Sequence, residues 1–227
     1  MRITWLGHSA FLIEGRDRIL IDPFLTGNPM AAISADKVEC DIICVTHGHM
    51  DHLGDAVNIA RRTGATIAAI LEMSEYLEKL GVKSVGFNLG GTAKIRDTSI
   101  TMVQALHSSS IGAPGLEFSA AMPVGMVIDS GKVVYHAGDT AVFGDMKLIG
   151  DLYKPDVALL PIGGFYTMDP RQAALAVKLI RPKTVVPMHY NTWDLIKVDP
   201  KDFQALVRKQ SKTVKVVILK PGEVLDL

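Results

Sequence analysis

The sequence predicts an α/β fold in which two mixed β-sheets pack face to face between outer layers of helices, a four-layer αββα sandwich. Short apolar and β-branched runs, which are typical of strands, dominate the first half of the chain. The second half alternates helical and strand patterns. Mixed sheets with helices outside them favour such a layered arrangement. The 227 residues, 48% hydrophobic and 21% charged, are expected to form one domain over residues 1–227.

Strands are predicted where β-branched or apolar runs lie between turn residues. In the first half they cover residues 2–6, 10–14, 18–24, 40–46 and 65–71, with further strands within 93–106. A hairpin is predicted over 124–139, and strands follow at 156–161, 184–189 and 213–219. Residues 108–123 are predicted to be a long loop, which is uncommon in compact domains unless it is functional.

Helices are predicted where apolar residues recur at helical spacing. The pattern over 53–64 ends at Gly64, and a short helix over 73–81 is expected to have Ser74 as its N-cap. Further helices are predicted near residues 145–152 and over 169–180 and 199–210.

The composition excludes some classes of partner. Lys and Arg together equal Asp and Glu, so the formal net charge is zero, which argues against a protein dominated by attraction to nucleic acid or an anionic membrane. No apolar stretch approaches the ~20 residues needed to cross a bilayer, and the first residues lack the features of a secretory signal. Cys40 and Cys44 provide no extracellular disulfide framework, and Cys44 is expected to be a buried, inert thiol. We therefore expect a cytoplasmic protein without a membrane partner.

Four metal-competent side chains lie within six residues of the segment "VTHGHMDHLGD", residues 45–55. They are His47, His49, Asp51 and His52. So many imidazoles beside a carboxylate would be costly to desolvate unless a cation lay among them. Residues two apart in an extended segment point the same way, so His47 and His49 can converge on one ion. Asp51 and His52, where the chain turns into a helix, point to a neighbouring position.

Further candidate ligands adjoin the ends of predicted strands. His107 and His189 each end one, and Asp139 follows His136 at the end of another. A side chain at a strand end is held by a rigid scaffold and remains open to a cleft, as a catalytic metal requires. Alone, each of these histidines would be interpreted as a hydrogen-bonded core residue and Asp139 as part of a turn. The neighbouring cluster favours metal binding instead.

The order of these motifs resembles the metallo-β-lactamase fold superfamily. The set "WLGHSAF", "THGHMDHLGD", "HAGDT", "PIGGFYTM" and "PMHYNT" more closely resembles a small family of metal-dependent hydrolases within it, UPF0173. The resemblance covers nearly the whole chain. It implies a first ion held by His47, His49 and His107, a second held by Asp51, His52 and His189, and the Asp139 carboxylate as a bridge between them.

The resemblance also implies two divalent ions per chain with a bridging hydroxide. Imidazole and carboxylate ligands suit zinc, manganese, iron or nickel, of which zinc is the first choice by analogy and manganese the second. Two ions that flank a water lower its pKa toward ~7. Asp51 is predicted to accept or relay the proton of that water, and Asp139 to bridge the ions. Protonation of the leaving group is assigned to His8, Tyr190 or a second metal-bound water, and the choice is left open.

Other residues are predicted to support the centre. His8 lies in a turn and is expected to be a proton donor, an anion contact or a partner of a ligand, unless it only bonds its own turn. Asp22 is predicted to accept the far N–H of a ligand His, unless it only starts an Asp-Pro turn. His136 is expected to support the site or to pack, and Thr46 and Thr140 to orient neighbouring carboxylates or imidazoles.

Three loops are predicted to wall a substrate pocket. The residues assigned to its polar wall are Ser108, Gly163, Gly164, Tyr190 and Asn191. Phe165, Tyr166 and Trp193 offer either apolar or stacking surface for a substrate or ordinary loop packing.

These features predict a hydrolase that cleaves a phosphodiester or another ester or lactone bond in a small-molecule or nucleotide-like substrate. The first alternative is a metal-dependent ligand-binding or sensing protein with little turnover, although the ligand set leaves room for water, as a structural zinc site does not. The second is an RNA-processing nuclease, for which this neutral chain lacks a basic surface, so a nucleic-acid partner is not expected. A homo-oligomer is left open.

Overall fold

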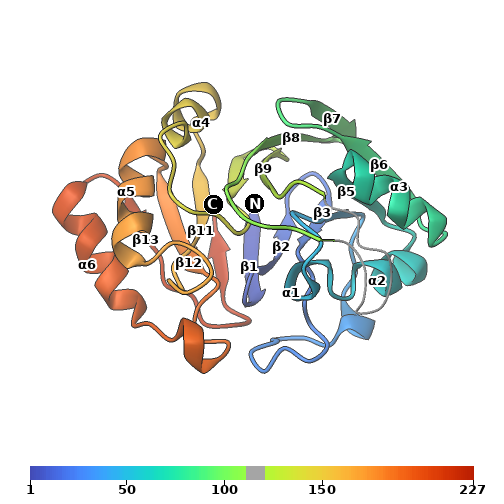
Figure 1. The fold of residues 1–227 in the computed structure, drawn as a ribbon, viewed down its shortest axis with the longest axis horizontal. Coiled ribbons are helices and arrows are strands. Elements are labelled where there is room, and N and C mark those ends of the chain that lie inside the picture. The colour runs from blue at the N-terminus through green and yellow to red at the C-terminus, as the bar shows by residue number, and fades with distance from the viewer. Residues whose placement is uncertain (111–120) are drawn as a thin grey trace.

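A computed structural model describes residues 1–110 and 121–227, and two mixed β-sheets form its centre (Figure 1). The first sheet contains β1 (Arg2–Gly7), β2 (Ala10–Glu14), β3 (Arg18–Ile21), β4 (Ile42–Cys44), β5 (Thr66–Ile70), β6 (Ser84–Phe87) and β14 (Val224–Asp226). The second contains β7 (Thr92–Ile95), β8 (Thr98–Gln104), β9 (Val124–Asp129), β10 (Val133–His136), β11 (Val157–Pro161), β12 (Thr184–Met188) and β13 (Lys215–Val216). Their spatial orders are β14-β1-β2-β3-β4-β5-β6 and β13-β12-β11-β10-β9-β8-β7.

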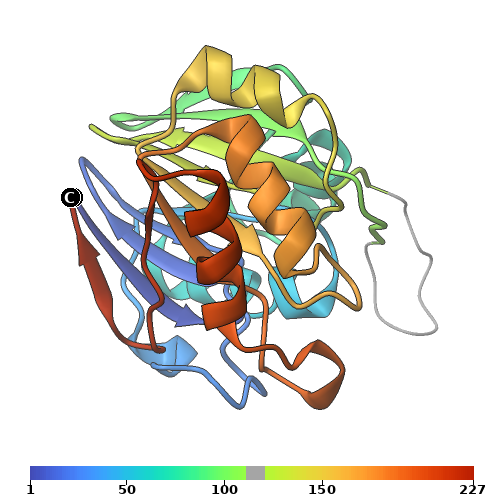
Figure 2. The same ribbon diagram turned by 90° about the vertical axis from the view of Figure 1, so that its left-hand side faces the viewer.

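Helices cover the outer faces of both sheets. The helices on these faces are α2 (Ala56–Thr63), α3 (Leu71–Lys79), α4 (Met146–Tyr153), α5 (Pro170–Ile180) and α6 (Pro200–Gln210), whereas the short α1 (Met50–Leu53) follows the end of β4. Figure 1 shows α2 and α3 on one side and α4 to α6 on the other, and Figure 2 shows α4 to α6 lying across the second sheet. The predicted αββα sandwich is therefore confirmed. None of the described helices is long and apolar enough to cross a membrane.

Strand direction places several strand ends at one edge. In the first sheet β1, β2 and β3 are antiparallel neighbours, and β3 to β6 run parallel. In the second sheet β7 to β10 are antiparallel neighbours, and β10 to β13 run parallel. As a result β1, β3 and β4 share one direction, and so do β8, β10 and β12. Their carboxyl ends lie at a common edge of each sheet, where α/β proteins place ligands.

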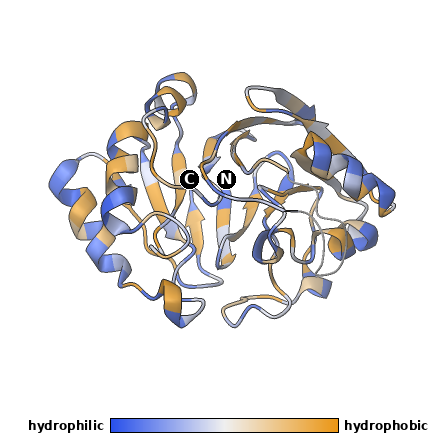
Figure 3. Cartoon of the chain, viewed as in Figure 1, coloured by the Kyte–Doolittle hydropathy of each residue, from blue (hydrophilic) through white to orange (hydrophobic). Residues whose placement is uncertain are grey.

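The hydrophobic core is formed by strands of both sheets and by the buried faces of the helices packed on them. In Figure 3 the strands are largely hydrophobic, whereas the helices also carry hydrophilic residues. All three residues of β4 are buried, as expected for a strand that is covered on both faces. Cys44 is one of them, and burial raises the pKa of its thiol far above the ordinary value. Burial also raises the pKa of Cys40 to about 11, so both thiols are protonated and unreactive at neutral pH.

Two predictions about helices are corrected by the structure. The predicted helix over 53–64 is shortened to α2, because the preceding helix α1 ends at Leu53 and is followed by Gly54, where a Cβ would lie 2.5 Å from the carbonyl oxygen of Pro23. The close approach of that loop requires a glycine and interrupts the helix. Ser74 is not an N-cap, because α3 begins at Leu71 and the Ser74 hydroxyl instead donates to Ser84 Oγ at 2.8 Å.

The predicted strands agree with the structure except at the sheet edges. β6 and β14 were not predicted, and the strand predicted over 213–219 is reduced to the two residues of β13. The hairpin of β9 and β10 lies where it was expected. Of the predicted loop, residues 108–110 and 121–123 have no regular structure, and 111–120 lie outside the described residues.

The contact between α4 and α5 predicts the effect of a small substitution. A Cβ added at Gly150 would overlap the carbonyl of Ile180 at the end of α5. We expect Gly150→Ala to lower the free energy of unfolding by about 1–3 kcal/mol, because the helices would have to separate. Gly144→Ala is the matched control, since nothing lies within 4 Å of a Cβ there. Urea unfolding of both variants tests this, and equal stability would show that α4 can move freely.

Candidate metal centre

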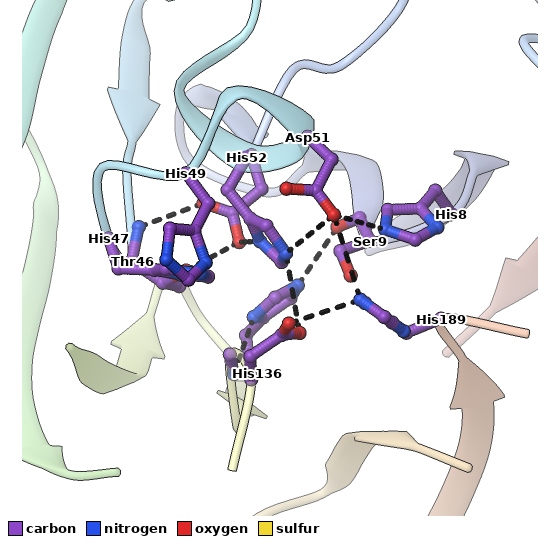
Figure 4. A network of polar contacts seen from close by, with 12 residues as sticks. His8, Ser9, Thr46, His47, His49, Asp51, His52, His136 and His189 are labelled. Carbon is purple, nitrogen blue, oxygen red and sulfur yellow. Dashed lines mark hydrogen bonds and ion pairs between the residues drawn. The ribbon is translucent and has the colours of Figure 1, made fainter. Parts of the chain in front are cut away.

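The candidate metal centre lies where strand ends from the two sheets meet. The loop after β4 and helix α1 carry the clustered donors, and single donors follow β8, β10 and β12 of the other sheet. Figure 4 shows the side chains of the segment after β4, among them His47, Asp51 and His52, facing His189 from the other sheet. The structure brings together all seven predicted ligands: His47, His49, Asp51, His52, His107, Asp139 and His189.

The first donor group consists of His47, His49 and His107, each with one nitrogen within 4.8 Å of the others. His47 Nε2 lies 3.0 Å from His49 Nδ1. The backbone at His49 is extended, with φ −63° and ψ 146°, which lets side chains two residues apart face the same way. His107 reaches the group from the end of β8, in the second sheet.

The second donor group consists of Asp51, His52 and His189, together with His8. Asp51 Oδ2 lies 3.9 Å from the Nε2 atom of His52 and 3.9 Å from that of His189. Helix α1 begins at Met50, so Asp51 and His52 follow helical geometry and leave the direction taken by His49. This turn separates the second group from the first.

Asp139 adjoins both groups. Its Oδ1 lies 3.3 Å from His52 Nε2, and its Oδ2 lies 3.1 Å from His189 Nε2 and 3.5 Å from His107 Nε2. The side chain is only 3% exposed. Three imidazole nitrogens therefore surround one buried carboxylate, which is the position expected of a bridge.

The donor atoms fit divalent ions. Their separations of 3.0 Å to 3.9 Å bracket the roughly 3.4 Å between ligand atoms of a tetrahedral ion with bonds of about 2.1 Å. Within the described part of the chain, His52 Nε2, Asp139 Oδ1 and both ring nitrogens of His189 are buried without a hydrogen-bond partner. Such orphaned buried atoms are costly, and coordination of a cation would satisfy the inward-facing ones.

Burial sets the charge state of the first group. It holds the pKa of His47 well below the ordinary value, and the charge of His52 adds to this effect. Burial also lowers the pKa of His49 and that of His107. All three rings are therefore neutral at pH 7, which is the form in which imidazole binds a metal.

In the second group, charged neighbours outweigh the effect of burial on the pKa values. Burial would lower the pKa of His52, but the charges of Asp139 and Asp22 hold it well above the ordinary value. Burial would raise the pKa of Asp139, yet His189 and His52 keep it well below the usual range. For Asp51 burial is likewise outweighed, by the hydrogen bond from His8 and the charge of His52, so both carboxylates are anionic. A proton on His52 Nε2 competes with a cation for the same position.

Asp22 and Thr46 lie directly behind the donors. The fully buried Asp22 carboxylate accepts from His52 Nδ1 at 2.8 Å, from the Thr46 hydroxyl at 2.7 Å and from the Thr46 backbone N–H at 2.8 Å. The hydroxyl of Thr46 also lies 3.0 Å from His47 Nδ1. Because the carboxylate accepts the Nδ1 proton, His52 turns Nε2 toward the centre.

His8 lies behind Asp51 and is fully buried. Burial and the neighbouring His189 lower the pKa of His8 to about 4, so its ring is neutral. Its Nε2 then donates to Asp51 Oδ2 at 3.2 Å, and its Nδ1 accepts from the Thr192 hydroxyl at 2.7 Å. The His8 carbonyl accepts from Trp5 Nε1 and from the backbone N–H of His189, both at 3.0 Å. Of the roles left open for His8, this geometry fits that of a hydrogen-bond partner of Asp51, a predicted metal ligand.

His136 and Thr140 support the backbone around the donors. His136 is fully buried, donates from Nε2 to the Ser9 carbonyl at 3.0 Å and accepts from the Gly138 N–H at Nδ1 at 3.1 Å. The Thr140 hydroxyl accepts from the Leu106 N–H at 2.9 Å, next to His107, and donates to the Ala141 carbonyl. Thr140 thus contacts the backbone, and no carboxylate or imidazole that it would orient is among its hydrogen-bond partners in the described residues.

A pocket of about 520 Å³ opens over the donors. Ser108 is the one residue of the predicted polar wall that lines it, and Gly163, Gly164, Tyr190 and Asn191 are not part of its described lining. Tyr190 is 4% exposed and stacks on Trp5, with ring centroids 5.4 Å apart. Burial raises the pKa of Tyr190 to about 12.

The Asn191 side chain has a structural contact instead. Its Oδ1 accepts from the Val198 N–H at 2.8 Å, while the two glycines lie on the loop after β11. Sequence reasoning missed Phe24 and Met50 in the pocket and Thr192 behind His8. Their positions beside Asp22, His49 and Trp193 were the available signal.

Comparison with known proteins identifies the family. A family model for the beta-lactamase superfamily domain matches residues 17–190. A UPF0173 metal-dependent hydrolase of Methanosarcina barkeri is 52% identical over 228 residues, covering 100% of this chain and 99% of that protein. One from Archaeoglobus fulgidus is also 52% identical, covering 98% and 97%.

A solved structure agrees with these relatives. The metallo hydrolase Igni18 of Ignicoccus hospitalis superposes with a TM-score of 0.90 at 43% identity, covering 99% of this chain and 97% of its own. The chain therefore belongs to the UPF0173 family of metal-dependent hydrolases, within the metallo-β-lactamase superfamily.

Proposed function

We propose that this protein hydrolyses an ester bond, in a phosphodiester, a carboxylic ester or a lactone, with two divalent ions bound at the donors described above. His47, His49 and His107 would hold one ion, Asp51, His52 and His189 the other, and Asp139 would contact both. The observation that carries the proposal is the buried Asp139 carboxylate, with three imidazole nitrogens 3.1 Å to 3.5 Å from its oxygens.

The ions would lower the pKa of a water molecule and polarise the substrate oxygen, which is the chemistry such centres supply. Asp51 lines the pocket and would accept a proton from the attacking water. Its low pKa prevents it from retaining that proton, so it passes the proton on to solvent. His8 fixes the Asp51 carboxylate through Oδ2 and does not itself line the pocket.

Zinc is the first choice of metal by analogy with the family and manganese the second, and a donor set of imidazole and carboxylate without a thiolate is compatible with both. The test is metal analysis of protein purified without chelator, followed by assays with Zn²⁺ and Mn²⁺. We expect close to two ions per chain, together with hydrolysis of bis-p-nitrophenyl phosphate, a p-nitrophenyl ester or a simple lactone. Metal binding without turnover of any of them would favour a sensing protein, and full activity after complete metal removal would exclude the proposal.

Acid is expected to release the ions in two steps. A ligand imidazole must be neutral, so falling pH favours the proton over the metal, with release below about pH 6. The pKa of His52 is raised whereas those of His47, His49 and His107 are lowered, so the ion at His52 should leave first. Metal content after dialysis between pH 7.5 and 4.5 measures this. Full occupancy at pH 5 would contradict a shell dominated by histidines.

A further inference from the structure

The opening above the metal centre is a small-molecule pocket with mainly apolar walls. Its volume of about 520 Å³ lies within the range of roughly 300–1,000 Å³ that is usual for small ligands. Apart from the metal-centre residues themselves, its lining consists of Phe24, Met50, Ser108, Tyr166 and Trp193. Four of these five side chains are aromatic or methionine.

The apolar side chains at the rim are exposed to water. Met50 is 64% exposed and Tyr166 is 47% exposed. Phe165, 64% exposed, packs edge-on against Tyr166 with ring centroids 4.8 Å apart. Large apolar groups gathered around a concave site mark a surface that is covered by a ligand. Met50 lies in sequence between His49 and Asp51, so the rim is fixed by the same segment that carries donors.

Away from the proposed metal ligands, the described walls of the pocket carry no cationic side chain. Its described lining contains neither Lys nor Arg, and its acidic side chains are Asp51 and Asp139. Phosphate and carboxylate groups of ligands are usually bound by Arg or Lys. An anionic group beyond the reacting bond would therefore meet no countercharge from these walls.

We propose that the substrate is an uncharged carboxylic ester or lactone whose apolar chain or ring lies against Met50, Tyr166 and Trp193. This inference rests on the proposed ester hydrolysis and narrows it. In the reaction the oxygen of water bonds to the acyl carbon and the acyl C–O bond breaks. The alcohol oxygen takes up one proton, and the other is released as the acid ionises.

The first test is a chain-length series of p-nitrophenyl esters, from acetate to octanoate, with the metal-loaded protein. Burial of one CH₂ contributes about 0.8 kcal/mol, which corresponds to about fourfold. We expect kcat/KM to rise two- to fourfold per CH₂ until the pocket is filled, and bis-p-nitrophenyl phosphate to react at least tenfold more slowly than the octanoate. A flat series, or a faster reaction with the phosphodiester, would overturn the inference.

Two variants test whether the apolar chain of the substrate contacts the proposed pocket residues. Met50→Ser and Tyr166→Ser change exposed side chains, so the fold should be retained. Each should lower the ratio of octanoate to acetate kcat/KM about fivefold or more. Leu152→Ser is the matched control, because Leu152 is 71% exposed on α4 and is not part of the lining. An unchanged ratio in both pocket variants would contradict the proposed contacts.

A binding measurement separates failure of this inference from failure of the proposed function. Trp193 lines the pocket and Trp5, the other tryptophan, is buried, so ligand binding should change Trp193 fluorescence. We expect octanamide, but not acetamide, to give a saturable change in the loaded protein that Trp193→Phe removes. If octanamide binds but no ester is hydrolysed, the proposed function fails and the apolar pocket stands. If esters are hydrolysed without chain-length dependence and octanamide does not bind, only this inference fails.

Discussion

Asp139→Ala is expected to abolish measurable turnover and to reduce the bound metal to one ion per chain or fewer. The substitution removes a carboxylate that lies 3.3 Å from His52 Nε2 and 3.1 Å from His189 Nε2. Without this carboxylate, two adjacent divalent cations would repel each other in a buried site that has one negative charge fewer. Loss of a residue that only hydrogen-bonds to a metal ligand typically lowers metal affinity or activity about 10–100-fold. We expect the loss of Asp139, as the proposed bridging ligand, to have a larger effect.

Metal content and kcat/KM, measured together, test this expectation. Far-UV circular dichroism should remain close to that of the unsubstituted protein, because Asp139 follows β10 and belongs to no helix or strand. Asp145→Ala provides the control, since Asp145 is exposed and makes no side-chain cap to α4. Full activity with two ions in Asp139→Ala would show that the bridge is assigned to the wrong residue.

Asp22→Ala is expected to have the largest effect on stability. It leaves His52 Nδ1 and two groups of Thr46 buried without their acceptor. Removal of one member of such a buried charged network costs about 3–5 kcal/mol. Alanine also fits poorly here, because residue 22 has φ +43°. Urea unfolding measures the loss, and Asp36→Ala, at an exposed position, should stay within about 0.5 kcal/mol of the parent.

Asp22→Asn separates the effect of Asp22 on stability from its effect on which ring nitrogen of His52 carries the proton. The amide keeps the shape and tolerates the positive φ, so it should lose less stability than alanine. An amide has one accepting oxygen, and when that oxygen keeps the Thr46 backbone N–H, the NH₂ group faces His52 Nδ1 and cannot accept from it. His52 would then favour the tautomer with its proton on Nε2, which faces the metal centre. We expect metal affinity to fall about 10–100-fold even where the fold is retained. If Asp22→Asn binds both ions normally, the hydrogen bond at 2.8 Å does not set the tautomer.

The sequence predicts the fold best where a strand's own residues determine its burial. β4 is an apolar run and is buried throughout. β6, β13 and β14 could not be predicted in this way, because they lie at sheet edges and pair through backbone groups that carry no side-chain signal. Ser74 shows the same limit. Its hydroxyl forms a hydrogen bond with Ser84, a tertiary contact that helix-capping preferences cannot predict.

The clustered donors were the most direct part of the site to predict, because three histidines and an aspartate within six residues would repel and desolvate one another without a cation between them. The distant donors depend on which strand ends meet, and that follows from strand order. The sequence could indicate that Asp22 bonds a ligand histidine, but not that this is His52, 30 residues away. The pocket wall was hardest to predict. His189 and Asn191 have φ values of +54° and +60°, and Tyr190 between them packs on Trp5 and is not part of the pocket's described lining.

The division of the donors between the two sheets also has a consequence for folding. Four of them follow β4 in one sheet, and the other three follow β8, β10 and β12 in the opposite one. Ions bound there would act as a cross-link between the two halves of the sandwich, and the unfolded chain has no comparable assembled shell. By mass action, free metal at 100 times its dissociation constant would add about 2.7 kcal/mol per site to the native state. The melting temperature should therefore follow the metal supply.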